Sequence, residues 1–96
     1  MASYMIVDVD IHDPDAYQSY KAQVTPIIEK FGGKYLVRGG THETLENDLW
    51  APTRLVILRF PDRDAASSFI HSPEYAPLKK IRRDNSDSTV IIVEGV

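Results

Sequence analysis

Two short runs in the second half of the chain, residues 55–58 and 90–93, are apolar at every position. Successive side chains of a β-strand point to opposite faces of the sheet, so strands of this kind need cover on both faces. A chain of 96 residues is the usual size for one domain, too short to cover both faces by itself. We therefore expect helices on one face and a second copy of the chain on the other, which makes a homodimer. The alternative is a monomer with unusually hydrophobic strands.

The patterns of strands and connections are spread along the whole chain. The expected strands are residues 4–11, 34–38, 54–60 and 89–93. Residues 41–46 are expected to extend the second strand as a bent or bulged segment. Residues 47–53 are expected to form a loop, with Trp50 as a pocket lid or a dimer anchor. The polar residues 85–88 indicate a turn.

Helix starts are marked by acidic or hydroxyl side chains. Asp13-Pro14 begins the first helix, because an aspartate oxygen accepts from free backbone N–H groups and proline has no N–H to satisfy. Its apolar residues recur at spacings of three and four up to Gly32-Gly33. Asp62 begins a second helix, and Ser72-Pro73 opens a further helical segment through about Arg83. This order predicts one α+β ferredoxin-like domain over residues 1–96, a βαββαβ unit with a four-stranded antiparallel sheet and helices on one face.

Composition and spacing argue against several classes of function. The net charge of −3 has the wrong sign for binding nucleic acid. The absence of cysteine excludes disulfides, cysteine-ligated metals and a thiol nucleophile. The three histidines lack metal-site spacing and the glycine pairs lack the spacing of a nucleotide loop, so we expect no metal and no cofactor. With neither a signal peptide nor a membrane span in the pattern, we expect a cytoplasmic protein without a membrane partner.

Five strings follow one another along the chain, DPDAYQSY, FGGKYLVRGG, RLVILRFPD, HSPEYAPLKKIR and VIIVEG. The most specific parts are Arg38-Gly39-Gly40, Ser72-Pro73-Glu74-Tyr75 and Glu94-Gly95. Over essentially its whole length the sequence resembles a small bacterial family, domain of unknown function 1330. The resemblance implies a ferredoxin-like subunit that dimerises into an α/β barrel, as in the antibiotic-biosynthesis monooxygenase and muconolactone isomerase relatives. It implies no activity and no catalytic residue.

Two arginines are the first candidates for a ligand site. Arg38 and Arg54 each lie at an end of an otherwise apolar strand, where a guanidinium needs an anion, a carbonyl or water. Either one is suited to binding an anionic substrate. The alternative is that they are paired with carboxylates of the chain, for which the candidates are Glu46, Asp8 and Glu94.

Aromatic and titratable side chains complete the candidate site. Tyr20 lies on the inward stripe of the first helix, and its hydroxyl is expected at the rim of the core. Tyr75 and Arg82 are seven residues apart, two helical turns, and are able to point into one cleft. In the alternative, Arg82 joins Lys79, Lys80 and Arg83 in a solvated basic helix end that complements the helix dipole. His71 is the candidate for proton transfer near neutral pH, although a histidine at a helix junction is more often structural.

Two functions from different classes remain open at this level. In the first, a homodimer binds a small, anionic organic metabolite in a cleft between sheet and helices, at Arg38, Arg54, Tyr75 and Tyr20. In the second, the same cleft belongs to a small cofactor-independent enzyme of isomerase or monooxygenase type, with His71 as the candidate catalytic residue. The fold supports the second function, and the lack of a convergent set of acid, base and electrophile supports the first.

Overall fold

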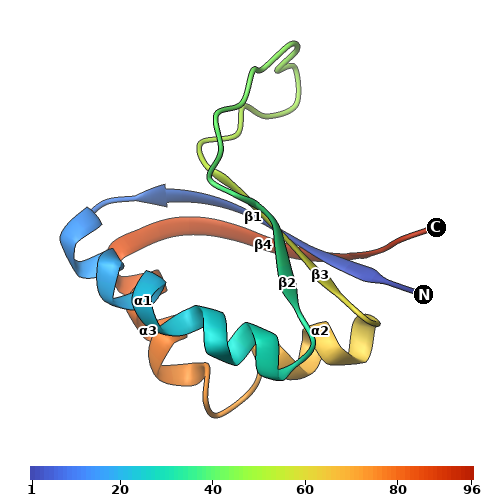
Figure 1. Cartoon of the computed structure of the whole chain (residues 1–96). Coiled ribbons are helices and arrows are strands. Elements are labelled where there is room, and N and C mark those ends of the chain that lie inside the picture. Colours follow the sequence, from blue (N-terminus) through green and yellow to red (C-terminus); the bar gives the residue numbers. More distant parts are fainter.

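The computed structural model describes residues 1–96, the whole chain. Its elements are β1 (Ser3–Ile11), α1 (Pro14–Lys30), β2 (Lys34–Arg38), β3 (Leu55–Phe60), α2 (Arg63–Ile70), α3 (Ala76–Asn85) and β4 (Ser86–Glu94). The four strands form one antiparallel sheet in the order β2-β3-β1-β4. All three helices lie on one face of this sheet, and the other face is open (Figure 1). The predicted α+β, ferredoxin-like fold is confirmed.

The helix boundaries follow from local hydrogen bonds. The Asp13 carboxylate accepts a hydrogen bond from the Ala16 backbone N–H at 3.1 Å, directly before Pro14. Asp62 accepts from the Ala65 N–H at 2.8 Å in the same way and starts α2. The first helix ends where Gly32 takes a φ of +83°, a conformation that side chains with a Cβ rarely adopt. The predicted starts of α1 and α2 are therefore confirmed. The start predicted at Ser72-Pro73 is wrong, because a turn follows Ser72 and α3 begins only at Ala76, without a side-chain cap.

Strand parity decides which side chains meet the helices. Met5 and Val9 of β1 and Leu58 and Phe60 of β3 are buried under the helical layer. Met5, Leu58 and Phe60 pack with apolar residues of the helices, among them Phe69, in one hydrophobic core. The alternate residues of these strands, such as Ile6 and Asp8, lie on the open face. None of the helices is long and apolar enough to cross a membrane.

Two expected elements are absent. Residues 41–46 form no strand, because the partner strand β3 begins only at Leu55 and the pairing ends with the Gly39 N–H bonded to the Leu55 carbonyl at 2.7 Å. The predicted turn at 85–88 is also wrong, because α3 ends at Asn85 and β4 begins at Ser86. Ser86, the first residue after α3, is already paired with Ile11 of β1, so strand pairing starts directly where the helix ends.

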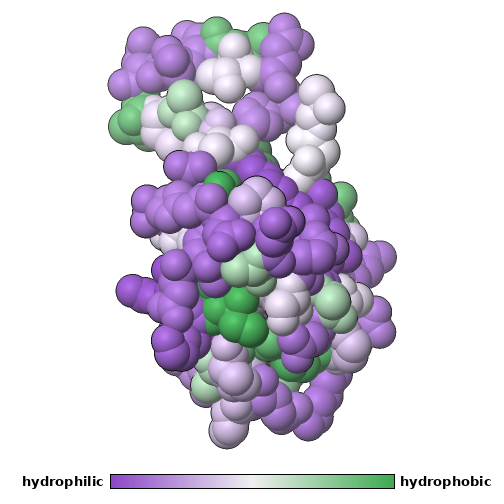
Figure 2. Space-filling model, turned by 90° about the vertical axis from the view of Figure 1, so that its left-hand side faces the viewer, coloured by the Kyte–Doolittle hydropathy of each residue, from purple (hydrophilic) through white to green (hydrophobic).

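The segment between β2 and β3 forms a long loop that projects from the sheet on the side opposite the helices (Figure 1). In Figure 2 the loop stands above the body of the molecule, and its surface is mostly hydrophilic. Two of its leucines are nevertheless highly exposed, Leu45 and Leu49. Its base is attached to β1, because the Asp8 carboxylate accepts from the Trp50 indole N–H at 2.7 Å and from the Thr53 N–H at 2.8 Å.

Candidate functional site

A pocket lies between the sheet and the helical layer, and nearly every element contributes to its wall. Its apolar lining comes from the core side of the strands and from α1 and α2, for example Val7, Val24, Val56 and Phe69. Four tyrosines also line it, Tyr17, Tyr20, Tyr35 and Tyr75. The free volume is about 40 Å³. A water molecule needs about 10–15 Å³ by this measure, so the pocket has room for a few waters only.

An irregularity in β2 turns Arg38 toward this pocket. Tyr35 is paired with Leu58, but Arg38 is paired with Val56, so β2 carries one extra residue between them. Without this bulge, Arg38 would lie on the face opposite Tyr35, because side chains alternate. With it, Arg38 shares the helix-facing side with Val56. The Arg38 guanidinium lies 4.5 Å from the centre of the Tyr35 ring and donates a hydrogen bond to the Lys21 carbonyl at 3.2 Å.

Arg54 enters the pocket from the start of β3 and packs against the Gly39 backbone. A Cβ atom at Gly39 would lie 2.5 Å from Arg54 Nε, closer than any real contact, so the guanidinium occupies the space that a side chain would take. Gly39 also has a φ of +69°, which favours glycine. The guanidinium of Arg54 therefore lies against the residue that follows Arg38, and both arginines line the pocket.

A chain of three polar groups also lines the pocket, with Tyr20 from α1, Tyr75 from the turn before α3 and Arg82 from α3. Arg82 Nε donates to the Tyr75 hydroxyl at 3.2 Å, and the Tyr75 and Tyr20 hydroxyl oxygens are 2.8 Å apart. Arg82 also donates through Nη1 to the Ser88 hydroxyl. Only 5% of Arg82 is exposed. The expectation of a convergent Tyr75 and Arg82 is confirmed, and Arg82 is not part of a solvated helix end.

Burial favours the protonated form of three phenols of this pocket, those of Tyr17, Tyr20 and Tyr35. Desolvation raises the pKa of Tyr17 and of Tyr35, and it raises the pKa of Tyr20 most strongly. The neighbouring Tyr75 hydroxyl adds to the effect on Tyr20, since it is hydrogen bonded to the neutral form. Near neutral pH these side chains are therefore hydrogen-bond donors rather than bases.

The charges in the pocket are all of one sign. Every lining residue that is not hydrophobic is cationic: Lys21, Arg38, Arg54 and Arg82. None of these four has a carboxylate within 4.0 Å, because the ion pairs of the chain join other residues. The alternative that Arg38 and Arg54 are paired with Glu46, Asp8 or Glu94 is therefore wrong. The protein as a whole has a net charge of −3, so the cationic lining is a local feature.

Asp8 was an expected partner of the arginine side chains, but its carboxylate binds other groups. Its carboxylate accepts from Trp50, Thr53 and the Arg54 backbone N–H, the last at 3.1 Å. Burial alone would raise the pKa of Asp8, but these hydrogen bonds outweigh it and hold the pKa below its usual value. Asp8 fixes the base of the loop and leaves the Arg54 side chain unpaired.

The family model described as "Domain of unknown function (DUF1330)" matches residues 2–96. The chain belongs to the DUF1330 family. No curated protein matches this DUF1330 chain in sequence.

Solved structures with similar coordinates share the fold of this DUF1330 protein. A protein of unknown function from Rhodopseudomonas palustris, RPA0582, is 23% identical with a TM-score of 0.75, covering 99% of this chain and 82% of that one. The cofactor-independent oxygenase SnoaB from Streptomyces nogalater is 15% identical with a TM-score of 0.64, covering 99% and 93%. A dimeric ferredoxin-like protein of unknown function from Jannaschia sp. CCS1 is 12% identical with a TM-score of 0.63, covering 99% and 100%.

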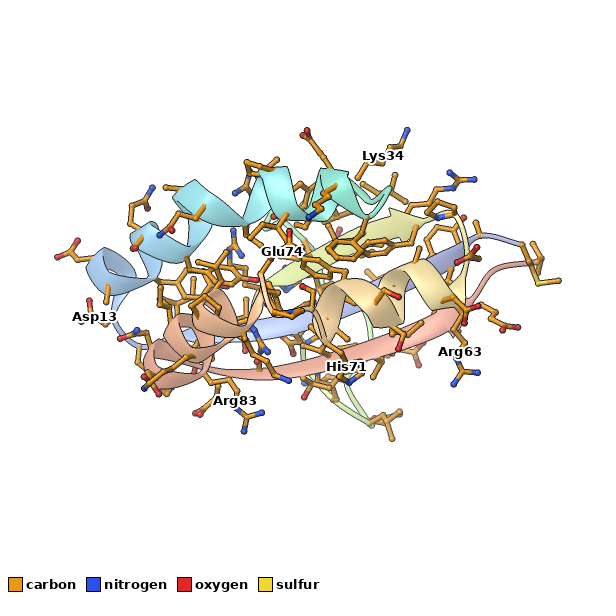
Figure 3. All side chains as sticks on the ribbon, turned by 90° about the horizontal axis from the view of Figure 1, so that it is seen from below. Asp13, Lys34, Arg63, His71, Glu74 and Arg83 are labelled. Carbon is orange, nitrogen blue, oxygen red and sulfur yellow. The ribbon has the colours of Figure 1, made fainter.

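The structure brings four of the predicted site residues of this DUF1330 chain to one pocket. These are Arg38, Arg54, Tyr20 and Tyr75. His71 is not among the lining residues. It is exposed at the end of α2, its Nδ1 lies 2.9 Å from the Ser67 carbonyl, and Figure 3 shows it on the β4 side of the helical layer, away from α1.

The predicted site residues do not include three further polar residues of the lining, Tyr17, Lys21 and Tyr35. Tyr17 and Lys21 are four residues apart and next to Tyr20, so helical spacing was a signal that all three share a face. No local pattern indicated that Tyr35 faces the pocket, because the face on which it lies depends on how β2 is paired with β3. No group of three or more His, Cys, Asp or Glu side chains able to hold a metal ion is present.

Proposed function

We propose that this protein binds a small organic anion with an apolar body in the pocket between the sheet and the helices. One observation carries the proposal: every charged group of an otherwise apolar pocket is cationic, and none is neutralised by a carboxylate. Placing unpaired positive charges beside apolar surface is costly unless an anion joins them. A carboxylate on an aromatic or aliphatic ring fits this combination, since guanidinium groups bind carboxylates through paired N–H donors.

The two hydrogen-bonded phenols add a neutral donor. Tyr20 and Tyr75 carry one hydroxyl proton each, and the contact between them uses one proton. The bond from Arg82 to Tyr75 uses a proton of the guanidinium and none of the phenols. One phenolic proton is therefore left for a ligand oxygen. This donor favours a ligand with a second oxygen, such as a hydroxy acid or a keto acid.

Binding requires the pocket to widen, because about 40 Å³ is far too little for a metabolite. Arg38 is the side chain best able to move. It is exposed, and it is held by one hydrogen bond to Lys21 and by its contact with the Tyr35 ring. An outward swing of Arg38 opens the strand end of the pocket and keeps the positive charge at the entrance.

The alternative function is a cofactor-independent enzyme of isomerase or monooxygenase type. Such an enzyme usually needs a base to remove a proton from carbon. No carboxylate and no histidine lines the pocket, and the tyrosines with raised pKa values are poor bases near neutral pH. The likeness to the oxygenase SnoaB is one of fold at 15% identity. The chemistry of the lining therefore favours binding.

We propose further that the binding unit is a homodimer joined through the open face of the sheet. Large apolar side chains lie half exposed there, with Ile91 at 49%, Val93 at 45% and Leu36 at 48%. No helix covers this face (Figure 1). A dimeric protein with this fold, the one from Jannaschia sp. CCS1, supports the expectation. Contiguous apolar surface of this kind is typical of interfaces.

Calorimetric titration with benzoate and with the neutral isostere benzamide tests the binding function. We expect benzoate to bind and to raise the melting temperature, because ligands that bind the folded state stabilise it. Benzamide keeps the ring but removes the charge, so its affinity should be at least about tenfold lower. Arg38→Met and Arg54→Met should each weaken benzoate binding by about tenfold while the oligomeric state stays unchanged.

The matched control is Arg59→Met, in the strand that follows Arg54, because Arg59 is exposed and does not line the pocket. It should leave the benzoate affinity unchanged. Equal affinities for benzoate and benzamide would contradict the proposal. So would folded Arg38 and Arg54 variants that bind benzoate as the wild type does.

A further inference from the structure

A second cleft lies outside the pocket, along the edge of the sheet formed by β4. It has a volume of about 530 Å³ and is bounded by the end of α2, by α3 and by the first half of β4. Figure 3 shows two of its residues, His71 and Arg83, on the β4 side of the helical layer, opposite α1. The proposed function of the inner pocket makes no use of this cleft.

The charged face of α3 lines the cleft. Lys79, Arg82 and Arg83 follow one another at spacings of three and one, so they share one side of the helix. None of the three has a carboxylate within 4.0 Å. Lys80, between them in sequence, points elsewhere and is paired with Asp84 at 2.6 Å. In α3, Lys80 is therefore neutralised by a carboxylate, whereas the three cations that line the cleft have no counterion.

Arg82 is what distinguishes this cleft from an ordinary basic surface. Arg82 lines both cavities, and it is the only charged residue that does, since the other shared residues are Met5, Ile70 and Val90. It is 5% exposed, and its two hydrogen bonds, to Tyr75 and Ser88, go to neutral hydroxyl groups. A guanidinium has five N–H donors and these bonds use two of them, so one donor of Nη1 and both donors of Nη2 have no hydrogen-bond partner in the protein. Cations that merely complement a helix dipole stay in solvent, whereas this one is buried without an anion.

Little negative charge opposes these cations. Asp87 is the one acidic residue of the lining. Its carboxylate lies 3.0 Å from Nε2 of His12, a residue that does not line the cleft. One more group is able to donate toward an anion, because Ser88 accepts from Arg82 and keeps its own hydroxyl proton. His71 adds no donor in its neutral form, since its Nδ1–H is used by the Ser67 carbonyl at 2.9 Å.

We infer that this cleft binds a phosphate group, either as the free ion or as the phosphoryl group of a small metabolite. Three cations and a hydroxyl on one side match a tetrahedral dianion better than a flat monoanion, because a phosphate has three or four acceptor oxygens that point in different directions. The volume of about 530 Å³ admits a phosphate with a small organic group attached. Such an anion would supply the charge that buried Arg82 lacks.

The test is a titration of the whole protein with sodium phosphate, followed by two-dimensional amide NMR at constant ionic strength. We expect saturable shifts in the amides of α3 and the first half of β4. Lys79→Gln and Arg83→Gln should each weaken phosphate binding by about tenfold, since each removes a charge-assisted contact. Lys80→Gln removes the same charge one residue away and should change the affinity by less than about twofold.

Other outcomes would overturn the inference. Shifts that rise without saturation, or that acetate reproduces at the same concentration, would mean that the cleft only attracts anions in general. An equal loss in Lys79→Gln and Lys80→Gln would mean the same. Methyl phosphate separates the two sources: affinity equal to or above that of phosphate supports a phosphoryl group, and lower affinity supports the free ion. Arg38→Met should leave phosphate binding unchanged, so this site is tested independently of the inner pocket.

Discussion

The position of the Arg54 side chain depends on the lack of a side chain at Gly39. A Cβ there would lie 2.5 Å from Arg54 Nε and 2.7 Å from its Cζ. We expect Gly39→Ala to displace the guanidinium and to weaken benzoate binding by about tenfold. Because Gly39 has a φ of +69°, the alanine variant should also lose about 1–2 kcal/mol in the free energy of unfolding. Calorimetry and denaturant unfolding measure the two effects.

Gly40→Ala is the matched control for that substitution. A Cβ at Gly40 would meet nothing within 4 Å, and its φ is not positive. It should therefore leave both benzoate binding and stability almost unchanged. Similar behaviour of the two alanine variants would mean that Gly39 does not hold Arg54 in place.

Asp8 gives the stability of the protein a defined dependence on pH. Its pKa in the folded protein is lowered, because the hydrogen bonds from Trp50, Thr53 and Arg54 outweigh the effect of burial. A folded-state pKa below the unfolded value means that Asp8 stabilises the protein fully above the unfolded value, about 3.9. This contribution is lost as the pH falls through the folded-state pKa. Asp8→Asn should thus be less stable than wild type near neutral pH, with a difference that shrinks in acid.

Denaturant unfolding at a series of pH values measures this difference. Asp10→Asn is the control, because Asp10 is on the same strand and parity but is exposed. It should show a smaller effect at every pH. A gap between wild type and Asp8→Asn that stays constant into acid would contradict the assignment.

At the scale of elements, one helix cap and one turn contact stabilise the segments that lead into α1 and α3. Asp13→Ala removes the acceptor for the Ala16 N–H and should lower the free energy of unfolding by about 1 kcal/mol. Ser72→Ala should cost more, about 1–3 kcal/mol, because Ser72 is buried and its hydroxyl accepts from the Tyr75 N–H at 3.1 Å. Unchanged denaturant midpoints in both variants would mean that neither contact stabilises the segment that leads into its helix.

The element that matters most for the pocket is the bulge in β2. It changes the parity of the strand between Tyr35 and Arg38, so that both side chains face the helices. The bulge therefore joins the cation to the phenol beneath it, at 4.5 Å from the ring centre. An unbroken β2 would place Arg38 on the open face, where the proposed homodimer interface lies.

For the whole molecule, we expect an aspartate substitution to act differently on the two faces of the sheet, unfolding the chain on one face and preventing dimerisation on the other. Leu58 is 3% exposed and faces the helices, whereas Ile91 is 49% exposed on the open face. Light scattering of the wild type at micromolar concentration should give about twice the chain mass. Ile91→Asp should give a folded monomer. Leu58→Asp should unfold the chain, because a buried carboxylate without a partner costs several kcal/mol.

A wild-type monomer at micromolar concentration would contradict the dimer. A folded Ile91→Asp protein that remains dimeric would place the interface elsewhere. Circular dichroism distinguishes loss of folding from loss of association in both variants.

The sequence by itself determined the elements and their order. Strand alternation, the caps Asp13 and Asp62, and the turn at Gly32 depend on residues close together in the chain, where short-range hydrogen bonding and side-chain packing act. It also singled out Arg38, Arg54, Tyr20 and Tyr75, because a charge or a hydroxyl at the edge of an apolar segment needs a partner.

Only the tertiary structure decided which of these groups meet and which partners they lack. The parity of Arg38 depends on a bulge that exists only when β2 is paired with β3. The polar residues 86–88 form a strand because β1 extends far enough to pair with them. Arg82 is buried because α3 packs over the sheet beside Tyr75 and Ser88, although its neighbours in sequence are solvated. Register and burial depend on residues far apart in the chain, so no local pattern reports them.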